Sequence, residues 1–258
     1  MTPPDRVHRK SSPRAPAGYS AWEAAGLRWL AAAGGAAVVE VLGEGPRHLD
    51  LARLDPAPPT PEHAEALGHG LATTHAAGAP AFGSAPDGWT GDGWLGPLTE
   101  PWPLVLGAWP SWGPFYAQAR VAPLVRAGRD RSVLDRADVA VLDRLAGTVA
   151  AGTFDTGDPP ARLHGDLWSG NVMWTASGAV LIDPAAHGGH READLAMLAL
   201  FGCPYLERVV EAYAAATPLA DGWRERVALH QVHPLLLHAV LFGGAYAAQA
   251  VGAARHYA

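Results

Sequence analysis

Three polar side chains in the second half of the sequence have types and spacing that could do chemistry together. Asp166 and Asn171 stand five residues apart within "LHGDLWSGNVMW" (163–174), and Asp183 follows the short apolar run "AVLI". A carboxylate and an amide oxygen, completed by phosphate oxygens and water, form a hard ligand set that suits Mg²⁺. A further carboxylate can orient or deprotonate a hydroxyl group. The residue types therefore predict a magnesium-nucleotide and a hydroxyl held in line for phosphoryl transfer.

The order of the short segments predicts how these residues come together. The runs "NVMW" (171–174) and "AVLID" (179–183) flank "TASG", a pattern typical of a β-hairpin. A hairpin brings its ends side by side, so Asn171 and Asp183 are expected to share one Mg²⁺ while Asp166 faces the acceptor hydroxyl. The spacing D-x-x-x-x-N is also typical of kinase-like catalytic loops. A single Asx residue is common in any turn, and only the combination favours chemistry.

The N-terminal part of the sequence predicts a small unit that contains strands. Ser20 and Glu23 fit a capping box at the start of a helix over 20–33. Two short strands over 36–42 and 47–54 surround the turn signal "GEGP", which indicates a second hairpin. The segment "DPAPPTPE" (55–62) breaks regular structure and is the best candidate for a linker.

The rest of the sequence is mostly helical in pattern. Thr60 and Pro61 begin a helix that ends at Gly78. The segment 79–114 contains five Trp residues among Gly and Pro, and it is expected to be a loop packed by its own aromatic rings. Further helices are expected from about 114, over about 134–150, and from 191 to the end with breaks near Pro204 and Pro218.

Composition excludes several classes of protein. The formal charge of −6 argues against nonspecific binding to nucleic acid or anionic membranes, which needs basic patches. The single cysteine, Cys203, rules out an internal disulfide. The first residues form no secretory signal, and no apolar stretch is long enough to span a membrane. We expect a soluble cytoplasmic protein, and the sequence leaves its oligomeric state open.

Longer motifs narrow the expectation to one family. The segments "LHGDLWSGNVMW", "LIDPAAHGGHREADLAM" (181–197), "SWGPFYAQAR" (111–120) and "LFGGAY" (241–246) resemble the fructosamine kinase (ketosamine-3-kinase) family. That family belongs to the aminoglycoside-phosphotransferase-like branch of the protein-kinase-like fold. The resemblance covers about residues 10 to 250. H-G-D-x-x-x-x-N alone indicates only the branch, whereas Trp168-Ser169-Gly170 within it and Asp183-Pro184 after the hairpin point to the fructosamine group.

The resemblance implies a reaction and further roles. It implies phosphorylation by ATP, with Mg²⁺, of the sugar C3 hydroxyl of a ketosamine, free or protein-bound, to an unstable product whose breakdown removes the glycation adduct. Asp166 would be the catalytic residue, and Asn171 and Asp183 the metal ligands. Lys10 would bind phosphates and Glu23 would pair with it. Asp194 would hold the catalytic loop through its backbone, and the hinge to adenine would lie at Leu51, Ala52, Arg53 and Leu54.

Lys10 and Glu23 have simpler interpretations, and two histidines near the motifs have expectations of their own. Lys10 fits a solvated N-terminal tail as well as a phosphate site. Glu23 could complete the capping box with Ser20 instead of pairing with a lysine. His164 is expected to brace the catalytic loop by hydrogen bonds. His187, with His190, makes a poor zinc signal and is expected to have a substrate-site or structural role.

Two further expectations concern aromatic rings and imidazoles. Trp168 is the tryptophan most suited to stacking on a substrate. The C-terminal histidines His230, His233 and His238 are expected to be polar members of packed helices, without clustered partner ligands.

These observations predict an α+β, protein-kinase-like two-lobed fold, with a truncated N-lobe over 1–57 and a mostly helical C-lobe over 58–258. Only nine residues precede Lys10, too few for the two strands and Gly-rich loop that precede that lysine in the family. We expect either an upstream start or a truncated lobe. The alternatives are a kinase of the same branch that acts on an aminoglycoside or choline, and a non-catalytic pseudokinase.

Overall fold

The N-terminal unit is a three-stranded antiparallel sheet covered by one helix. The structure, a computed structural model, describes residues 6–258. The strands β1 (Val7–Ser11), β2 (Val41–Gly45) and β3 (His48–Ala52) lie in the order β1-β3-β2. Leu49 and Leu51 of β3 are buried, and they pack with Leu27 of α1 (Tyr19–Ala31). Lys10 is paired with Leu49, so its side chain lies on the face that α1 covers.

The expected capping box at the start of α1 is wrong. The helix begins at Tyr19 after Gly18, whose φ of 85° stops the chain from extending the helix, and no side chain caps it. Ser20 therefore lies inside the first turn, where its hydroxyl cannot act as an N-cap. Glu23 is freed from that local role, and its carboxylate turns to the ammonium of Lys10 instead.

The expected strand over 36–42 is only partly correct. β2 begins at Val41, and the residues before it pair elsewhere. The N–H of Val39 donates to the carbonyl of Leu181 at 3.0 Å, and the N–H of Leu181 donates to the carbonyl of Ala37 at 2.8 Å. This short parallel bridge joins the N-terminal unit to the hairpin that carries Asn171 and Asp183. Sequence periodicity cannot show a partner so far along the chain.

The hairpin itself is as predicted. β7 (Val172–Thr175) and β8 (Gly178–Leu181) are antiparallel, with Val172 opposite Leu181 and a two-residue turn between them. The N–H of Ile182 donates to the carbonyl of Asn171 at 3.0 Å, which continues the ladder towards the site. Beside it, β6 (Ala161–Leu163) pairs with β9 (His187–Gly189).

The segment 79–114 is packed by aromatic rings, as expected. It holds one small hairpin, β4 (Gly93–Leu95) and β5 (Trp102–Leu104). Trp89 lies between Trp22 and Trp94, with ring centroids 5.5 and 6.0 Å away. Trp22 comes from α1, so the loop is packed partly against the N-terminal helix and closes one side of the site.

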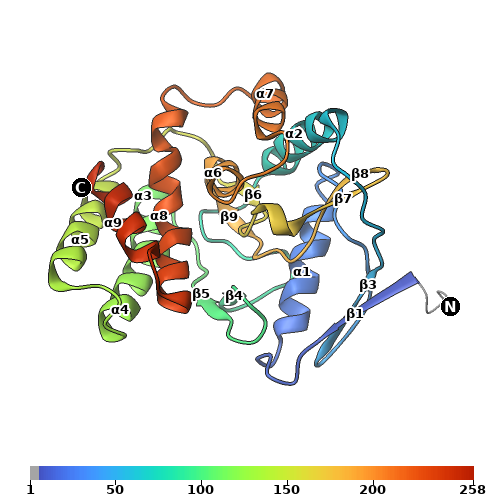
Figure 1. Cartoon of the computed structure of the whole chain (residues 1–258), viewed down its shortest axis with the longest axis horizontal. Helices are drawn as coiled ribbons and strands as arrows, with labels where there is room; N and C mark the ends of the chain where they lie inside the picture. Colours follow the sequence, from blue (N-terminus) through green and yellow to red (C-terminus); the bar gives the residue numbers. More distant parts are fainter. Residues whose placement is uncertain (1–5) are drawn as a thin grey trace.

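The helices form the rest of the molecule. Thr60 caps the first by accepting the N–H of His63 at 3.2 Å. The helical elements are α2 (Pro61–Ala76), α3 (Trp112–Phe115), a π-helical turn (Tyr116–Val121), α4 (Ala122–Asp130), α5 (Arg136–Ala150), α6 (Glu192–Leu200), α7 (Leu206–Ala216), α8 (Trp223–Phe242) and α9 (Tyr246–Arg255). Helices α4, α5, α8 and α9 gather at the end of the molecule opposite the N-terminal sheet, with the short strands and α6 between them (Figure 1). Over residues 6–258, no helix combines the length and apolarity that a membrane crossing needs.

Candidate active site

The polar residues that the sequence singles out lie around one cleft. Lys10 from β1, Asp166 from the loop after β6, Asn171 from the turn before β7, and Asp183 after β8 all line a cavity of about 290 Å³. Trp94 and Leu98 of the loop and Leu241 of α8 close its other sides. The cleft therefore lies between the N-terminal unit and the helical body. The strands next to these residues are all paired: β1 with β3, β6 with β9, and β7 with β8.

Lys10 stands between two carboxylates. Its Nζ donates to both carboxylate oxygens of Glu23, at 3.0 and 2.8 Å, and lies 3.0 Å from Oδ1 of Asp183. Burial alone would lower the pKa of Lys10, but the charges of Glu23 and Asp183 outweigh it and the pKa is raised. The pKa of Glu23 is raised by burial, against the opposing effect of Lys10. Lys10 is therefore a charged, anchored strand residue and not a solvated tail.

The amide of Asn171 is held on one side. Its Nδ2 donates to the carbonyl of Asp166 at 2.8 Å, to Oδ2 of Asp166 at 3.2 Å and to the carbonyl of Asp183 at 3.4 Å. These contacts all use the nitrogen, so the amide oxygen is turned to the other side and is left available as an acceptor. Asp183 has a φ of 53°, an unusual conformation for a residue other than glycine, and its side chain is 42% exposed in the cleft.

Asp166 is a carboxylate whose pKa the site shifts towards neutral pH. Burial raises the pKa of Asp166 to about 7, and the nearby charges of Asp183 and Asp194 act in the same direction. The hydrogen bond from Asn171 and the charge of Lys10 oppose that shift. A carboxylate with a pKa close to neutral is suited to accept a proton from a hydroxyl and to release it again.

A buried carboxylate fixes the backbone of the loop before Asp166. Asp194 of α6 accepts the N–H of His164 at 2.8 Å and the N–H of Gly165 at 3.0 Å. His75 of α2 holds Oδ2 of the same carboxylate at 3.2 Å and is itself 2.8 Å from the hydroxyl of Tyr213. Burial would raise the pKa of Asp194, but the hydrogen bonds and charges around it lower the pKa overall. His75 was not expected, because its partners lie more than a hundred residues away in sequence.

His164 connects the loop to the end of the hairpin. The N–H of Asp166 donates to Nδ1 of His164 at 3.3 Å, so the ring proton lies at Nε2, which donates to the carbonyl of Ile182 at 2.9 Å. Burial lowers the pKa of His164, which keeps the ring neutral in this arrangement. His164 therefore lies behind the site, next to Asp166 and two residues from it in sequence.

Trp168 forms part of the cleft wall and depends on the glycine that follows it. Its side chain is 40% exposed and lines the cleft. A Cβ at Gly170 would overlap the far edge of the Trp168 ring, so the ring lies directly over this glycine. The W-x-G order thus places a flat aromatic surface beside Asp166, and a larger residue at position 170 would displace it.

The expected hinge residues line a neighbouring cavity. Leu51, Ala52, Arg53 and Leu54, with Val39, Met173 and Ile182, surround a space of about 460 Å³. Lys10 and Asp183 line both this cavity and the cleft with Asp166. A mainly apolar space that opens beside a lysine and a carboxylate has the properties of a site for a purine base with its phosphates at the polar end.

His187 lies apart from this cleft. It is buried on β9, and its Nδ1 donates to the carbonyl of Ala185 at 2.8 Å. Burial lowers the pKa of His187 to about 3, with the charge of Arg120 as a second cause. His187 instead lines a smaller inner cavity that also reaches Asp166.

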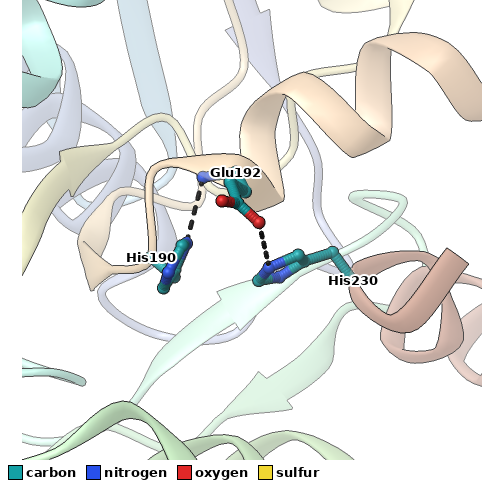
Figure 2. A group of neighbouring side chains, drawn as sticks. All are labelled: His190, Glu192 and His230. Atoms are coloured by element: carbon teal, nitrogen blue, oxygen red, sulfur yellow. Dashed lines mark hydrogen bonds and ion pairs between the residues drawn. The ribbon is translucent and has the colours of Figure 1, made fainter. Parts of the chain in front are cut away.

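The expectation that His230 lacks clustered partners is wrong. Figure 2 shows His190, Glu192 and His230 with their polar atoms directed at one another, all three buried. Most of these polar atoms, however, already make hydrogen bonds within the protein, which disfavours a metal centre. Nδ1 of His190 accepts the N–H of Glu192 and Nε2 contacts the hydroxyl of Thr156 at 2.9 Å, while Arg226 holds both carboxylate oxygens of Glu192. Of these three residues, only His230 has ring nitrogens without a hydrogen bond, and its Nε2 lies 3.4 Å from Oε2 of Glu192.

Comparison with known proteins agrees with this geometry. The sequence pattern of the fructosamine kinase family matches residues 6–257. A Synechocystis sp. protein named "Probable ketoamine kinase" is 34% identical over 185 residues, which are 71% of this chain and 58% of that protein. The chain thus spans less than two thirds of the length of this relative.

Solved structures extend the comparison to the fold. The crystal structure of a Thermobifida fusca protein, provisionally named fructosamine-3-kinase, is 48% identical with a TM-score of 0.88, and the match covers 96% of this chain and 84% of that one. The gentamicin complex of an aminoglycoside phosphotransferase, APH(2")-IIa, has a TM-score of 0.63 at 12% identity, covering 97% and 85%, and shares the fold alone. The fold is therefore α+β and of the aminoglycoside-phosphotransferase and protein-kinase type, and the chain belongs to the fructosamine kinase family.

Proposed function

We propose that the protein phosphorylates the sugar C3 hydroxyl of ketosamines such as fructosamines and ribulosamines, with Mg²⁺·ATP as the phosphoryl donor. The observation that carries the proposal is one cleft lined by Lys10, Asp166, Asn171 and Asp183, with an apolar cavity at its far side. Phosphoryl transfer depends mainly on positioning and charge neutralisation, and these residues supply both. The choice of a ketosamine rests on the family.

The ligands available in the cleft fit Mg²⁺. The carboxylate of Asp183 and the free amide oxygen of Asn171 are hard donors on neighbouring strand ends, and the metal needs further oxygens from phosphates and water. Nζ of Lys10 lies 3.0 Å from Oδ1 of Asp183, so Mg²⁺ would share this carboxylate with the ammonium. When bound, Mg²⁺ would neutralise charge on the phosphates of the nucleotide.

Other residues around the cleft would bind the adenine, the phosphates and the sugar. The apolar cavity beside Leu51–Leu54 would hold the adenine, and Lys10, kept in place by Glu23, would hold the phosphates. Asp166 would accept or orient the proton of the sugar hydroxyl, and Asp194 and His164 would keep its loop in position. Trp168 would support the sugar from the side. With the proposed division into lobes at residues 1–57 and 58–258, the nucleotide would lie mainly against the first lobe and the sugar against the second.

Substitution of Asp166 tests this assignment. Asp166→Asn removes the proton acceptor and keeps the size of the side chain, so we expect turnover to fall about 10²- to 10⁴-fold. The measurement is ADP formation with the ketosamine of a simple amine. Asp143→Asn, on the exposed face of α5, is the matched control and should keep full activity. Equal turnover in Asp166→Asn and wild type would exclude Asp166 as the catalytic residue.

A panel of acceptors tests the substrate class. Ketosamines, aminoglycosides and choline are compared at equal concentration with wild-type protein. The proposal requires that ketosamines have the highest kcat/KM. A higher value with an aminoglycoside or choline would overturn the substrate assignment and leave the kinase chemistry in place. Thermal shift with Mg²⁺·ATP supplies a readout that needs no acceptor, because a ligand that binds only the folded state stabilises it.

A further inference from the structure

A second, smaller cavity adjoins the cleft at the catalytic carboxylate. It shares Leu95, Asp166 and Leu237 with the cleft, so the two spaces meet there. Its accessible volume of about 50 Å³ has room for roughly three or four water molecules, or for a group as small as a carboxylate. Its walls come from the β9 region, α8 and the π-helical turn.

Most of the buried polar side-chain atoms that lack a hydrogen bond within residues 6–258 belong to residues that line this inner cavity. Within residues 6–258, the buried side-chain nitrogens and oxygens without a partner are Nδ1 of His63, Nη2 of Arg120, and both ring nitrogens of His230. Arg120 and His230 line the inner cavity, whereas His63 does not. A buried polar atom normally has a partner, so a cluster of unpartnered atoms on one cavity points to a ligand that completes them.

Arg120 gives the cavity a positive charge that forms no direct ion pair within residues 6–258, although the charge of Asp92 acts on it from farther away. The residue is 3% exposed and its guanidinium stacks over Phe115 at 4.5 Å. Nη1 donates to the carbonyls of Val105 and Ala119, at 2.9 and 3.2 Å. Among the ion pairs of the described chain, none involves Arg120. A buried charge without an opposite charge is costly, and an anion in the cavity would offset that cost.

Two carboxylates, Asp166 and Asp194, also line the cavity. Neither forms an ion pair with Arg120, and Asp194 is already held by the N–H groups of His164 and Gly165 and by His75.

The other polar neighbours are not anions. The hydroxyl of Tyr116 donates to the carbonyl of Leu229 and accepts the N–H of His233, so it is fully engaged. Burial lowers the pKa of His187 and of His233, and the positive charge of Arg120 adds to both effects. Both rings are therefore neutral, and neither supplies or needs an anion. Burial lowers the pKa of Arg120 to about 9, which leaves it protonated at neutral pH.

We propose that the inner cavity is a carboxylate subsite, in which Arg120 binds the α-carboxylate of a ketosamine formed on the α-amine of an amino acid. This inference rests on the proposed function and names its substrate class. In such a ketosamine, a short chain of single bonds joins the sugar C3 hydroxyl to the carboxylate. Asp166 lies where the two cavities meet, so one molecule can place its hydroxyl at Asp166 and its carboxylate at Arg120.

The inner cavity accepts only a small anion, and the position of that anion relative to the sugar distinguishes between ketosamines. A triphosphate is too large for it and has its own site beside Lys10 and Asp183. A lysine side chain in a protein, glycated at its ε-amine, has no carboxylate close to the sugar. The subsite therefore favours free amino acid adducts over protein-bound adducts. His230 would complete the site with Nδ1, because its Nε2 already lies 3.4 Å from Oε2 of Glu192.

Two ligands that differ only in charge test the proposal on wild-type protein. The ketosamine of glycine carries the carboxylate, and the ketosamine of glycinamide carries a neutral amide of almost the same shape. A charge-assisted hydrogen bond to Arg120 should give the acid about 10- to 100-fold higher kcat/KM, mainly through KM. Equal kcat/KM for the two substrates would overturn the proposal. Because this comparison needs no variant, it does not depend on the folding of a mutant.

A variant assigns the preference to Arg120. In Arg120→Gln the ratio of kcat/KM for acid over amide should fall to about one. Arg162→Gln is the matched control, because Arg162 also stacks on an aromatic ring and donates to a backbone carbonyl but does not line the inner cavity. Its ratio should equal that of wild type. A ratio that persists in Arg120→Gln would exclude Arg120 as the anchor.

Binding measured without turnover separates this inference from the proposed function. If neither ketosamine is phosphorylated, the proposed function fails, and titration calorimetry with both ligands still decides the subsite. Tighter binding of the glycine ketosamine than of the glycinamide ketosamine would support it, and equal or absent binding of both would overturn it. If both are phosphorylated equally well, the kinase assignment stands and the carboxylate subsite is wrong.

Discussion

Asp166 connects the chemistry of the site to pH. Its raised pKa of about 7 means that Asp166 is protonated in about half of the protein molecules near neutral pH. If the ionised form accepts the hydroxyl proton, kcat/KM should rise with pH through about 7 and level off above it, since kcat/KM reports ionisation in the free enzyme. The measurement is a pH profile with both Mg²⁺·ATP and ketosamine well below their KM values, so that the free enzyme is the starting form. A profile that is flat between about pH 5 and pH 9 would contradict the assigned role of Asp166.

The same shift predicts that Asp166 lowers stability at neutral pH. The folded protein holds the Asp166 proton more tightly than the unfolded chain, whose Asp has a pKa of about 3.9. The free energy of unfolding therefore decreases as pH rises from about 4 to about 7, and the loss is complete above that range. Asp166→Asn cannot ionise, so it should be more stable than wild type at about pH 8, by about 1–2 kcal/mol in a cleft that admits water.

Denaturant unfolding of both proteins across pH measures this difference. The gain from Asp166→Asn should shrink towards zero below about pH 4, where wild-type Asp166 becomes protonated in both states. Asp143→Asn, which changes an exposed carboxylate, should show no such trend. A gain that does not vary with pH would mean that the substitution acts through packing and not through charge.

Sequence reasoning at this scale succeeded where partners are close along the chain. Asp166, Asn171 and Asp183 fall within one loop and one hairpin, so their spacing sufficed to predict that they share a cleft. His75 and Arg120 could not be found in this way. His75 meets Asp194 only after α2 packs beside the β-strands and α6, and Arg120 is recognisable as unpaired only when the burial of the whole π-helical turn is known.

At the scale of elements, the loop between β6 and β7 depends on a glycine. Gly165 has a φ of 80°, and a Cβ there would overlap the carbonyl of Ala185 and approach Nδ1 of His187 at 2.8 Å. Gly165→Ala should therefore combine backbone strain with a clash against backbone that cannot move easily, and lower the free energy of unfolding by about 3 kcal/mol or more. The measurement is urea denaturation followed by circular dichroism.

Gly157 serves as a control that separates the effect of the clash from that of backbone strain. Gly157 has a nearly equal φ of 78°, but no atom lies within 4 Å of a Cβ built there. Gly157→Ala should cost only the strain, about 1 kcal/mol. The difference between the two variants measures how tightly the catalytic loop packs on the segment before β9. If both variants lost the same stability, that packing would be looser than the structure indicates.

The elements that sequence predicted best were those with strong local signals. Thr60-Pro61 begins α2 because a hydroxyl cap and a proline act within one turn. Ser20 and Glu23 carry an equally clear local signal, yet the contact with Lys10 and the conformation of Gly18 decide the start of α1. A distant contact also overrides the local signal in the residues before β2, because they pair with Leu181 of β8 and not with their neighbours in sequence. A tertiary contact replaced the local preference in each case.

At the scale of the molecule, Lys10 joins segments that lie far apart in the sequence. It links β1 to Glu23 of α1 and to Asp183 after β8, and Figure 1 shows the N-terminal sheet and α1 at one end of the molecule, close to the β7–β8 hairpin. The side chain of Glu23 is 3% exposed, so its carboxylate relies on Lys10 for a counter-charge. The same lysine would thus serve both the stability of this junction and the binding of phosphates.

Lys10→Met separates these two roles. It leaves the buried carboxylate of Glu23 without a counter-charge, so we expect the free energy of unfolding to fall by about 3 kcal/mol at neutral pH. The double variant Lys10→Met/Glu23→Gln removes that charge too and should recover much of the loss. Neither variant should show the thermal shift with Mg²⁺·ATP that wild type shows, because both lack the phosphate-binding ammonium. A double variant no more stable than Lys10→Met would mean that the lysine stabilises the junction by packing, and a full nucleotide shift in either variant would remove Lys10 from the phosphate site.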